Sequence, residues 1–316
     1  NGEIISADSM QVYKGMDIGS AKIRKEEMQG VTHYLVDILE PEEEFHIVKF
    51  QELAKAAMEE IYAKGKIPIL VGGTGFYIQA LLYDINFDNV NMTEAVDKCK
   101  AFLSSDTGHL IVTPNPEIVM KAKDNPEFKE LINNADLVIP DGIGIIKAGN
   151  ILGTPLKERV AGYDLICNLF EEGKDGSISF YFWGSKPGIA EKAKQKIQEK
   201  YPKLNVLGTH NGYFNESEEK EIVEEIKTLK PDVLLVGLGM QKQEMIINKY
   251  LNDNMFKIGI GCGGSIDVIS GEVKRAPKIF IKMHLEWFYR LLKEPTRLKR
   301  MMVLPKFIKE VKKSRT

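Results

Sequence analysis

The sequence predicts an α/β protein built mainly around a parallel β-sheet with helices on both faces. Short apolar runs in the second part of the chain alternate with stretches of about 10 to 20 residues that carry a helical pattern. This alternation is typical of βαβ units, whose strands lie parallel and whose helices cover the sheet. Strands are expected at His109 to Val112, Leu137 to Ile139, Ser177 to Trp183, Leu204 to Leu207, Val233 to Val236 and Ile258 to Ile260. The 316 residues, 43% of them hydrophobic, suffice for a Rossmann-like domain with a sizeable core.

The first part of the chain predicts a partial α/β segment. Glu3 to Ala7 is typical of a short buried strand, and a helix is expected over residues 48–64. Ile67 to Val71 is a continuous apolar run, as in strands covered on both faces, and it leads into the glycine-rich turn 72–75. Such a turn either presents backbone N–H groups to an anion or is only a tight connection, and its position leaves both open.

Polar residues follow the first two strands of the second part. Thr113 and Asn115 come after one strand, and Asp141 comes after the next. Ligands of parallel sheets bind at the carboxyl ends of the strands, so these residues are candidates for a site. Asp141 in its Pro-Asp-Gly turn is also an ordinary helix cap, which position alone favours. Arg159, just before a predicted helix, serves a phosphate or pairs with a surface acid, and position leaves these equal.

The later strands are also followed by loops with polar or glycine-rich sequences. Residues 184–188 resemble a phosphate-cradling turn, although a lone glycine pair is a weak signal. Tyr213 is placed to stack on a base, but a tyrosine after a turn is more often packed. Gln243 lies near the tip of one loop, and Asp267 lies in the glycine-rich stretch 261–276. Because five loops converge on one edge of the sheet, the sequence predicts a single site there.

Charge is distributed unevenly along the chain. The net charge of -2 argues against a generally basic nucleic-acid binder, but residues 281–316 hold eleven basic and three acidic residues. Residues 280–292 alternate apolar and charged positions at helical spacing and contain Trp287, Phe288 and Tyr289. A helix packed on the sheet with solvated lysines is the commoner explanation. Basic clusters beside aromatic residues also suit an anionic membrane surface.

The cysteines and the hydropathy indicate a reducing compartment. Cys99, Cys167 and Cys262 are odd in number and have no CxxC spacing, so we expect free thiols that bind no metal. No apolar run approaches the roughly 18 residues that span a bilayer, and no signal peptide is evident. We therefore expect a cytoplasmic protein. Because the chain begins at Asn1 rather than at a methionine, we also expect its true start to be missing.

Two stretches of the first part carry a family resemblance. ISADSMQVYKGMDIGSAK at Ile5 to Lys22 and VGGTGFYIQALL at Val71 to Leu82 resemble the tRNA dimethylallyltransferases, which transfer a prenyl group to an adenine of tRNA. The resemblance implies Asp8 as general base, Gln11 as a base contact and Thr74 as a diphosphate contact. That family opens with a GxxxxGK[ST] phosphate loop, which this sequence lacks. We therefore interpret residues 1–88 as a vestigial segment and do not expect tRNA as a partner.

The second part resembles a different family, from about residue 89 to the C-terminus. TPNPEIV, IPDGIGI, ERVAGYD, GLGMQKQE and GGSIDVISGEVKRAP, in this order, resemble the WecG/TagA/CpsF glycosyltransferases. The best-known members transfer N-acetylmannosamine from its UDP derivative to undecaprenyl-diphosphate-linked GlcNAc, as in teichoic acid synthesis. The sequence departs from the family pattern at Gln241, usually proline, and at Ile266, usually phenylalanine.

The resemblance assigns roles to the strand-end residues. It implies Asp141 as the base of an inverting transfer, with Thr113, Asn115, Arg159 and Gln243 orienting the sugar and the diphosphate. Tyr213 and Asp267 are candidates for the nucleotide end. The tail arginines that match the family are Arg290, Arg297 and Arg300, which would close over the site and engage the diphosphate. No DxD pair occurs in the sequence, so we expect arginine rather than a metal cofactor to hold the leaving group.

The expected organisation is therefore threefold. Residues 1–88 form the partial prenyltransferase-like segment, 89–278 the glycosyltransferase core, and 279–316 a basic helical appendage that associates with the inner face of the cell membrane. The junction has two interpretations. Either Ile85 to Asp88 replaces the usual edge of the sheet, or the sheet is one strand short. A homo-oligomer is left open.

Overall fold

A computed structural model of the protein describes residues 2–45, 47–72, 85–283, 285–293 and 298–313. Within these ranges it gives only the backbone of Ile47, Val48, Lys278, Arg290, Lys299, Arg300 and Lys313. The chain forms two compact units. Unit 1 comprises residues 1–84 with 310–316, and unit 2 comprises Ile85–Lys309. This division does not test the family origin of each segment, so the threefold organisation stays a prediction.

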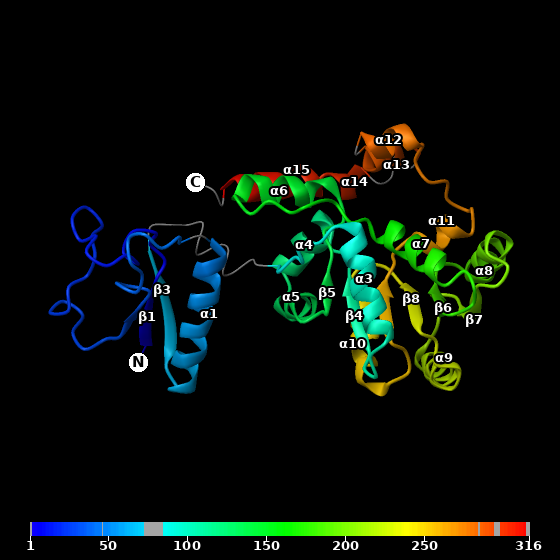
Figure 1. The fold of residues 1–316 in the computed structure, drawn as a ribbon, viewed down its shortest axis with the longest axis horizontal. Coiled ribbons are helices and arrows are strands. Elements are labelled where there is room, and N and C mark those ends of the chain that lie inside the picture. Colours follow the sequence, from blue (N-terminus) through cyan, green and yellow to red (C-terminus); the bar gives the residue numbers. More distant parts are fainter. Residues whose placement is uncertain (1, 46, 73–84, 284, 294–297, 314–316) are drawn as a thin grey trace. The chain divides into compact units, whose positions relative to one another are not determined.

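Unit 1 contains a small parallel sheet with a helix packed on it (Figure 1). Its strands are β1 (Gly2–Ser6), β2 (His33–Tyr34) and β3 (Ile67–Val71), in the order β2-β1-β3. The helix α1 (Ile47–Ala63) lies where the apolar spacing predicts it. Its residues Phe50, Ala54 and Ile61 are buried against Ile5 of β1, so this helix and the sheet share one small core.

Strand β3 differs from the expectation. Ile67, Ile69 and Val71 are 67%, 47% and 51% exposed, so one face of this strand is open to solvent. The expectation that both faces are covered is wrong. A continuous apolar run predicts burial on both sides only where elements exist to cover both. Among the described residues of unit 1, α1 supplies the helical cover on one face only.

Unit 2 is built on a six-stranded sheet in which every described pairing is parallel. The strands are β4 (His109–Val112), β5 (Leu137–Val138), β6 (Ser179–Gly184), β7 (Asn205–His210), β8 (Val233–Gly237) and β9 (Ile258–Gly261). Their order is β5-β4-β9-β8-β6-β7. All six predicted strands are confirmed, with ends that differ by at most three residues.

Helices cover both faces of this sheet. One layer consists of α3 (Met92–Leu103), α7 (Gly162–Glu172), α8 (Ile189–Lys200) and α11 (Ser265–Ile269). The other consists of α4 (Pro116–Lys123), α5 (Pro126–Asn133), α9 (Glu216–Leu229) and α10 (Lys242–Lys249), which is followed by the short 3-10 turn Leu251–Asp253. Strand β6 shows why both layers are needed, because Phe180 and Phe182 are buried in one core and Tyr181 and Trp183 in the other. The predicted Rossmann-like class is confirmed.

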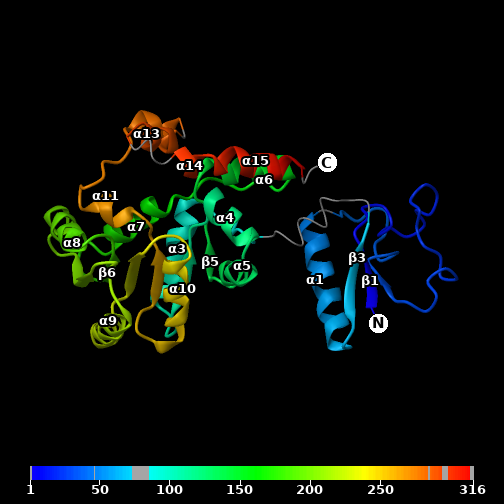
Figure 2. The same cartoon turned by 180° about the vertical axis from the view of Figure 1, so that it is seen from behind.

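The remaining helices lie on the carboxyl side of the sheet. They are α6 (Ile143–Leu152) and the C-terminal series α12 (Lys278–Lys282), α13 (Glu286–Lys293), α14 (Leu298–Met301) and α15 (Val303–Lys313). Within unit 2, α15 runs beside α6 in both views (Figures 1 and 2). A side-chain carbon of Leu304 lies 3.4 Å from the position that a Cβ on Gly144 would occupy, which places the two helices in contact.

The junction segment is attached to the edge of the large sheet. The Asp88 N–H donates to the Val138 carbonyl of β5 (2.9 Å), and Asp88 Oδ2 accepts from the Val138 N–H (2.8 Å). Ile85 and Phe87 pack against the core beneath it. Residues 85–88 form no strand. They satisfy the carbonyl and the N–H of Val138 at the open edge of β5 with one backbone hydrogen bond and one carboxylate.

Candidate active site

A cavity of about 520 Å³ lies at the carboxyl edge of the large sheet. It is lined by residues that follow β4, β5, β8 and β9, and by the first residues of α4, α6 and α7. The neighbouring strands β4 and β9 are followed by helices on opposite faces of the sheet, α4 and α5 on one face and α11 on the other, and ligands of open α/β sheets bind at such a point. The helices α4, α6 and α7 begin at this space, and α6 and α7 have no side-chain cap, so the positive dipole ends there favour an anion.

The cavity brings together most of the predicted site residues. Thr113, Asn115, Asp141, Arg159, Gln243 and Asp267 line it. Tyr213 does not line it and is 66% exposed. Arg290 and Arg300 lie in α13 and α14 with undescribed side chains, and Arg297 lies outside the described residues. The roles assigned to all of these residues stay predictions.

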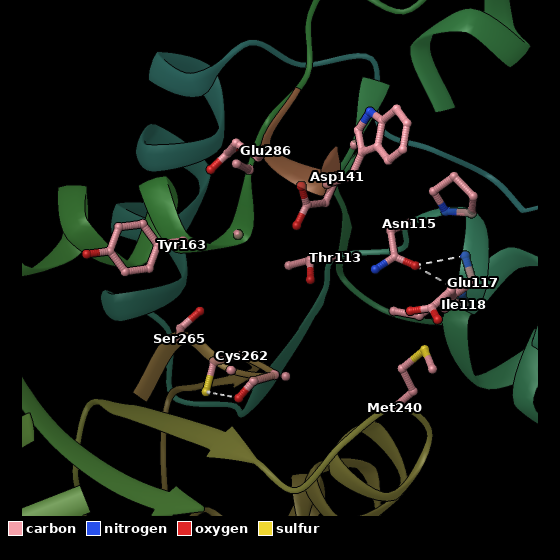
Figure 3. Close-up of a pocket in the computed structure, with 18 of the residues that line it drawn as sticks. Thr113, Asn115, Glu117, Ile118, Asp141, Tyr163, Met240, Cys262, Ser265 and Glu286 are labelled. Carbon is pink, nitrogen blue, oxygen red and sulfur yellow. Dashed lines mark hydrogen bonds between the residues drawn. The ribbon is translucent and has the colours of Figure 1, made fainter. Parts of the chain in front are cut away.

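The Asp141 carboxylate points into the cavity, between Thr113, Asn115 and Glu286 (Figure 3). The N-cap of α6 is Gly142, with a φ of 106°, and no side chain caps that helix. The capping role that position alone favoured for Asp141 is therefore wrong. The turn uses a backbone conformation that suits glycine and leaves the preceding carboxylate directed at the ligand space.

Asn115 has a structural and a potential binding function. Its Oδ1 accepts from the N–H groups of Glu117 and Ile118 (2.9 and 3.1 Å), which caps α4. The amide nitrogen is turned toward the cavity, on the side of Thr113 and Asp141 (Figure 3). One end of this side chain is thus fixed by the helix, and the other is a pre-oriented donor.

Thr113 is held in place by close packing against the start of α7. A Cβ added at Gly162 would lie 2.9 Å from Thr113 Cγ2 and 3.2 Å from its Oγ1. No real side chain tolerates that spacing without movement of Thr113. The glycine at the first position of α7 therefore fixes where the threonine hydroxyl stands in the cavity.

Gln243 is buried, and both the oxygen and the nitrogen of its side-chain amide are hydrogen-bonded. Its Oε1 accepts from the Gly263 N–H (3.1 Å), and its Nε2 donates to Glu244 Oε1 (2.7 Å). The backbone N–H of Gln241 donates to the other oxygen of Glu244 (2.6 Å). Burial raises the pKa of Glu244. This chain joins the loop after β9 to the start of α10, so Gln243 shapes the cavity wall.

The departure at Gln241 fits this arrangement. Gln241 has a φ of 72°, which proline cannot adopt, and its N–H is used by a buried carboxylate. A proline there requires a different turn after β8. Ile266, the other departure, is fully buried in the core beneath the cavity and fills that space with an aliphatic side chain.

Arg159 is bound to carboxylates on two sides. Its Nε lies 3.6 Å from Asp141 Oδ1 and has no hydrogen-bond partner in the described part of the chain. Its Nη2 lies 2.5 Å from Glu286 Oε2 of α13. Sequence position allowed Arg159 either a phosphate or a surface acid as its partner. The structure pairs it with the acids Asp141 and Glu286, and both line the cavity and do not belong to the outer surface.

Arg275 and Glu286 are lining residues that the sequence reasoning did not assign to the site. Arg275 Nε lies 3.6 Å from Glu286 Oε1, and its Nη1 and Nη2 bind Asp164 (2.7 and 2.8 Å). Its guanidinium also stacks on the Tyr163 ring at 4.6 Å. The sequence signal for Arg275 was its place in the motif GGSIDVISGEVKRAP, and no local pattern indicates Glu286.

Asp267 also lines the cavity. Its Oδ1 accepts from the Ser185 hydroxyl (2.5 Å), which joins α11 to the turn after β6. Ser185 has a φ of 64°, an uncommon conformation for a residue with a side chain. The turn at residues 184–188, which contains the glycine pair, therefore contacts the cavity lining through the bond from Ser185 to Asp267.

The described residues contain no group of three or more histidine, cysteine or acidic side chains arranged to hold a metal ion. The three cysteines are free. Burial raises the pKa of the Cys262 thiol at the cavity wall to about 12, so this thiol stays protonated near neutral pH.

In unit 1, the prenyltransferase-like residues serve local structure. Asp8 Oδ1 accepts from the N–H groups of Met10 and Gln11 (2.8 and 3.2 Å). The Gln11 side chain accepts from the Ser6 hydroxyl and donates to the Ser20 carbonyl (2.9 and 3.0 Å). Thr74 lies outside the described residues. These bonds stabilise a turn and a loop, and the vestigial assignment stays a prediction.

Comparison with known proteins defines the class of unit 2. The model of the glycosyl transferase WecG/TagA/CpsF family matches residues 80–316. The N-acetylglucosaminyldiphosphoundecaprenol N-acetyl-beta-D-mannosaminyltransferase of Bacillus spizizenii strain W23 is 35% identical over 230 residues, covering 72% of this chain and 89% of that protein. The enzymes of the same name from Bacillus subtilis strain 168 and Staphylococcus aureus strain MRSA252 are 32% and 34% identical, covering 93% and 91% of those proteins. The chain belongs to the WecG/TagA/CpsF family of glycosyltransferases.

The chain also has matches of a second kind, one to a family model over its first part and others to solved structures over most of its length. The IPP transferase family model matches residues 11–111. Two solved tRNA isopentenylpyrophosphate transferases, from Staphylococcus epidermidis and Bacillus halodurans, are 21% and 23% identical, with TM-scores of 0.28 and 0.27. The alignments cover 91% and 92% of this chain, and 82% and 78% of the two solved chains.

Proposed function

We propose that the protein transfers N-acetylmannosamine from UDP-N-acetylmannosamine to a GlcNAc residue linked to undecaprenyl diphosphate. The transferred sugar and the acceptor are those named for relatives that align over about nine-tenths of their length, and UDP is the nucleotide carrier that this proposal adds. The observation that carries the proposal is the Asp141 carboxylate, which points into the cavity and does not cap α6. All of the proposed chemistry is in unit 2.

The proposed reaction is a single displacement at the anomeric carbon. The oxygen of an acceptor hydroxyl forms a bond to that carbon, the bond from carbon to the UDP oxygen breaks, and UDP leaves with the electron pair. Asp141 takes the proton of the attacking hydroxyl. Because attack and departure occur on opposite faces of the sugar, the configuration at the anomeric carbon inverts.

Stabilisation of the leaving diphosphate needs positive charge. Arg159 lines the cavity beside Asp141, and the N-termini of α4, α6 and α7 add the positive ends of their dipoles. We propose that these groups replace the metal ion of many sugar-nucleotide enzymes, so that turnover continues in the presence of a chelator. The Asn115 amide and the Thr113 hydroxyl are donors suited to the sugar.

We further propose that the tail binds the cytoplasmic face of the cell membrane, where the lipid-linked acceptor lies. None of the described helices is long and apolar enough to cross a bilayer. The tail exposes large apolar side chains among its basic residues: Ile279, Met283, Phe288, Leu292, Leu298 and Met302. Apolar side chains that insert, together with cations worth about 1 kcal/mol each at an anionic leaflet, suit peripheral attachment.

The test is the release of UDP from UDP-N-acetylmannosamine with a short-chain GlcNAc-diphospholipid acceptor and a chelator present. We expect release that depends on the acceptor and that Asp141→Asn lowers by at least about a hundredfold, with an unchanged circular dichroism spectrum. Undiminished release by Asp141→Asn contradicts the assignment of the base. Release that requires added Mg²⁺ contradicts the metal-independent mechanism.

A further inference from the structure

Among the described side chains that line the cavity, acids outnumber bases, which is unexpected in a site for a diphosphate. The charged lining residues of the described chain are the acids Glu117, Asp141, Asp267 and Glu286 and the bases Arg159 and Arg275. A diphosphate brings two or more further negative charges. Displacement of one of the four carboxylates by the ligand would reduce this imbalance among the described side chains.

Glu286 is the carboxylate placed where a diphosphate would bind. One oxygen lies 2.5 Å from Arg159 Nη2, and the other lies 3.6 Å from Arg275 Nε. A single anion with two oxygens thus bridges two guanidiniums, which is the arrangement that phosphate groups adopt between arginines. The Glu286 side chain is 14% exposed, so this pairing occurs inside the cavity.

The two arginines are held by other partners besides Glu286. Arg275 is fixed by its two bonds to Asp164 and by the Tyr163 ring, and Arg159 stands beside Asp141. Arg159 Nε is buried without a hydrogen-bond partner among the described residues, so this guanidinium has a donor to spare. Arg275 therefore has contacts to Asp164 and Tyr163, and Arg159 an ion pair with Asp141, that do not involve Glu286.

Glu286 belongs to the C-terminal tail and not to the sheet or its covering helices. It occupies the first turn of α13, whose other side chains Phe288 and Leu292 are exposed, whereas both arginines lie on connections in the core of unit 2. The ion pairs of Glu286 with Arg159 and Arg275 therefore link the tail to the site.

Resting on the proposed function, we propose that Arg159 and Arg275 form the clamp for the donor's diphosphate and that Glu286 is the anion that the diphosphate displaces. Arg275 is then a binding residue for the reaction. In the empty enzyme, Glu286 neutralises the clamp and attaches α13 to the cavity. By thermodynamic reciprocity, any change that draws Glu286 out of the clamp strengthens diphosphate binding.

The test is calorimetric titration of the full chain with inorganic pyrophosphate at fixed ionic strength. Removing the competing charge in Glu286→Gln is expected to tighten pyrophosphate binding roughly tenfold, and Arg275→Gln to weaken it roughly tenfold. The control is Glu272→Gln, which removes a carboxylate that is half exposed, pairs with Lys192 and lies outside the cavity. This control should leave the affinity unchanged. Trp287 lines the cavity beside Glu286, so its fluorescence gives a second readout of occupancy.

Equal or weaker binding by Glu286→Gln overturns the proposal, because it makes Glu286 a support of the arginines and not their exchangeable partner. Failure of pyrophosphate to bind any of these variants also overturns it. A different outcome would reject the proposed function. Pyrophosphate binding with the predicted pattern but no sugar transfer would leave the clamp standing and reject the donor or the acceptor.

Discussion

The two units of this chain contain similar sequence signals, but among the described residues it is unit 2 that brings them together around a cavity. In unit 1, an apolar strand runs into a glycine-rich turn, yet its sheet has three strands, and the outer face of β3 is exposed. In unit 2, strands of the same kind form a six-stranded sheet with helices on both faces, and the ends of four strands meet at one cavity.

The difference lies in what surrounds each polar residue. Asp8 follows β1 as Asp141 follows β5, but the Asp8 carboxylate accepts from the N–H groups of its own turn. In the turn after β5, Gly142 adopts the positive φ, and the Asp141 carboxylate points into the cavity. A motif thus becomes a site only where neighbouring strands supply further groups around the same space.

The largest predicted effect compares the same substitution on strands of the two sheets. Ile260→Thr in β9 is expected to lower the free energy of unfolding of unit 2 by about 3 kcal/mol, because it leaves a void and buries a hydroxyl. Urea unfolding followed by tryptophan fluorescence measures this, since Trp183 and Trp287 both lie in unit 2.

The partner substitution is Ile69→Thr in β3. Ile69 is exposed, so we expect a change within about 0.5 kcal/mol, measured by hydrogen exchange of β1 and α1. A large loss from Ile69→Thr would mean that the β3 face is covered in the working protein, and the contrast between the two sheets would not hold.

A second prediction concerns how precisely unit 2 holds its site. Gly162→Ala is expected to lower kcat/KM about tenfold or more, because the added Cβ displaces Thr113. Thr113→Ser removes the closest methyl group and keeps the hydroxyl. The double variant Gly162→Ala with Thr113→Ser should therefore recover part of the loss. Full activity in Gly162→Ala alone would show that the position of Thr113 is not critical.

The smallest predicted effect is the acid sensitivity of unit 1. The hydrogen bond from Lys66, with help from Tyr34, lowers the pKa of Glu3 from 4.5 to about 2, although burial of the carboxyl opposes this. A depressed folded-state pKa contributes stability above about pH 4.5, and that stability is lost as the pH falls toward 2.

Hydrogen exchange of β1 and α1 should therefore accelerate as the pH is lowered from about 5 to about 3, after correction for intrinsic exchange rates. In Glu3→Gln this pH dependence should be reduced, whereas the exposed-carboxylate control Glu59→Gln should behave as the parent. The same pH dependence in Glu3→Gln and the parent would exclude Glu3 as its source.

Much of unit 2 could be predicted from the sequence, because its signals are local. Each buried strand is a short apolar run between helical stretches, and this periodicity places β4 to β9 within a few residues. The site edge follows, since parallel strands bring their carboxyl ends together. This reasoning placed Thr113, Asn115, Asp141, Arg159, Gln243 and Asp267 at one edge, and all six line the cavity.

What could not be predicted depends on contacts between distant segments. The pair of Arg159 and Glu286 joins residues 127 positions apart, and no local pattern indicates it. The run at β3 gives no sign of whether a second layer exists to cover it. Tyr213 lies outside the cavity lining because it follows β7, an edge strand that β6 separates from the strands β8, β9, β4 and β5 whose ends form the cavity.

The measurement that tests the central claim most directly is a matched comparison of Asp141→Asn and Asp8→Asn in the full chain. Both variants exchange an aspartate after a strand for its neutral isostere, one in each unit. Acceptor-dependent release of UDP from UDP-N-acetylmannosamine is measured for both, with circular dichroism as the check of folding. The account predicts a loss of at least about a hundredfold for Asp141→Asn and no change for Asp8→Asn. Equal activity of the two variants, or a loss confined to Asp8→Asn, would contradict it.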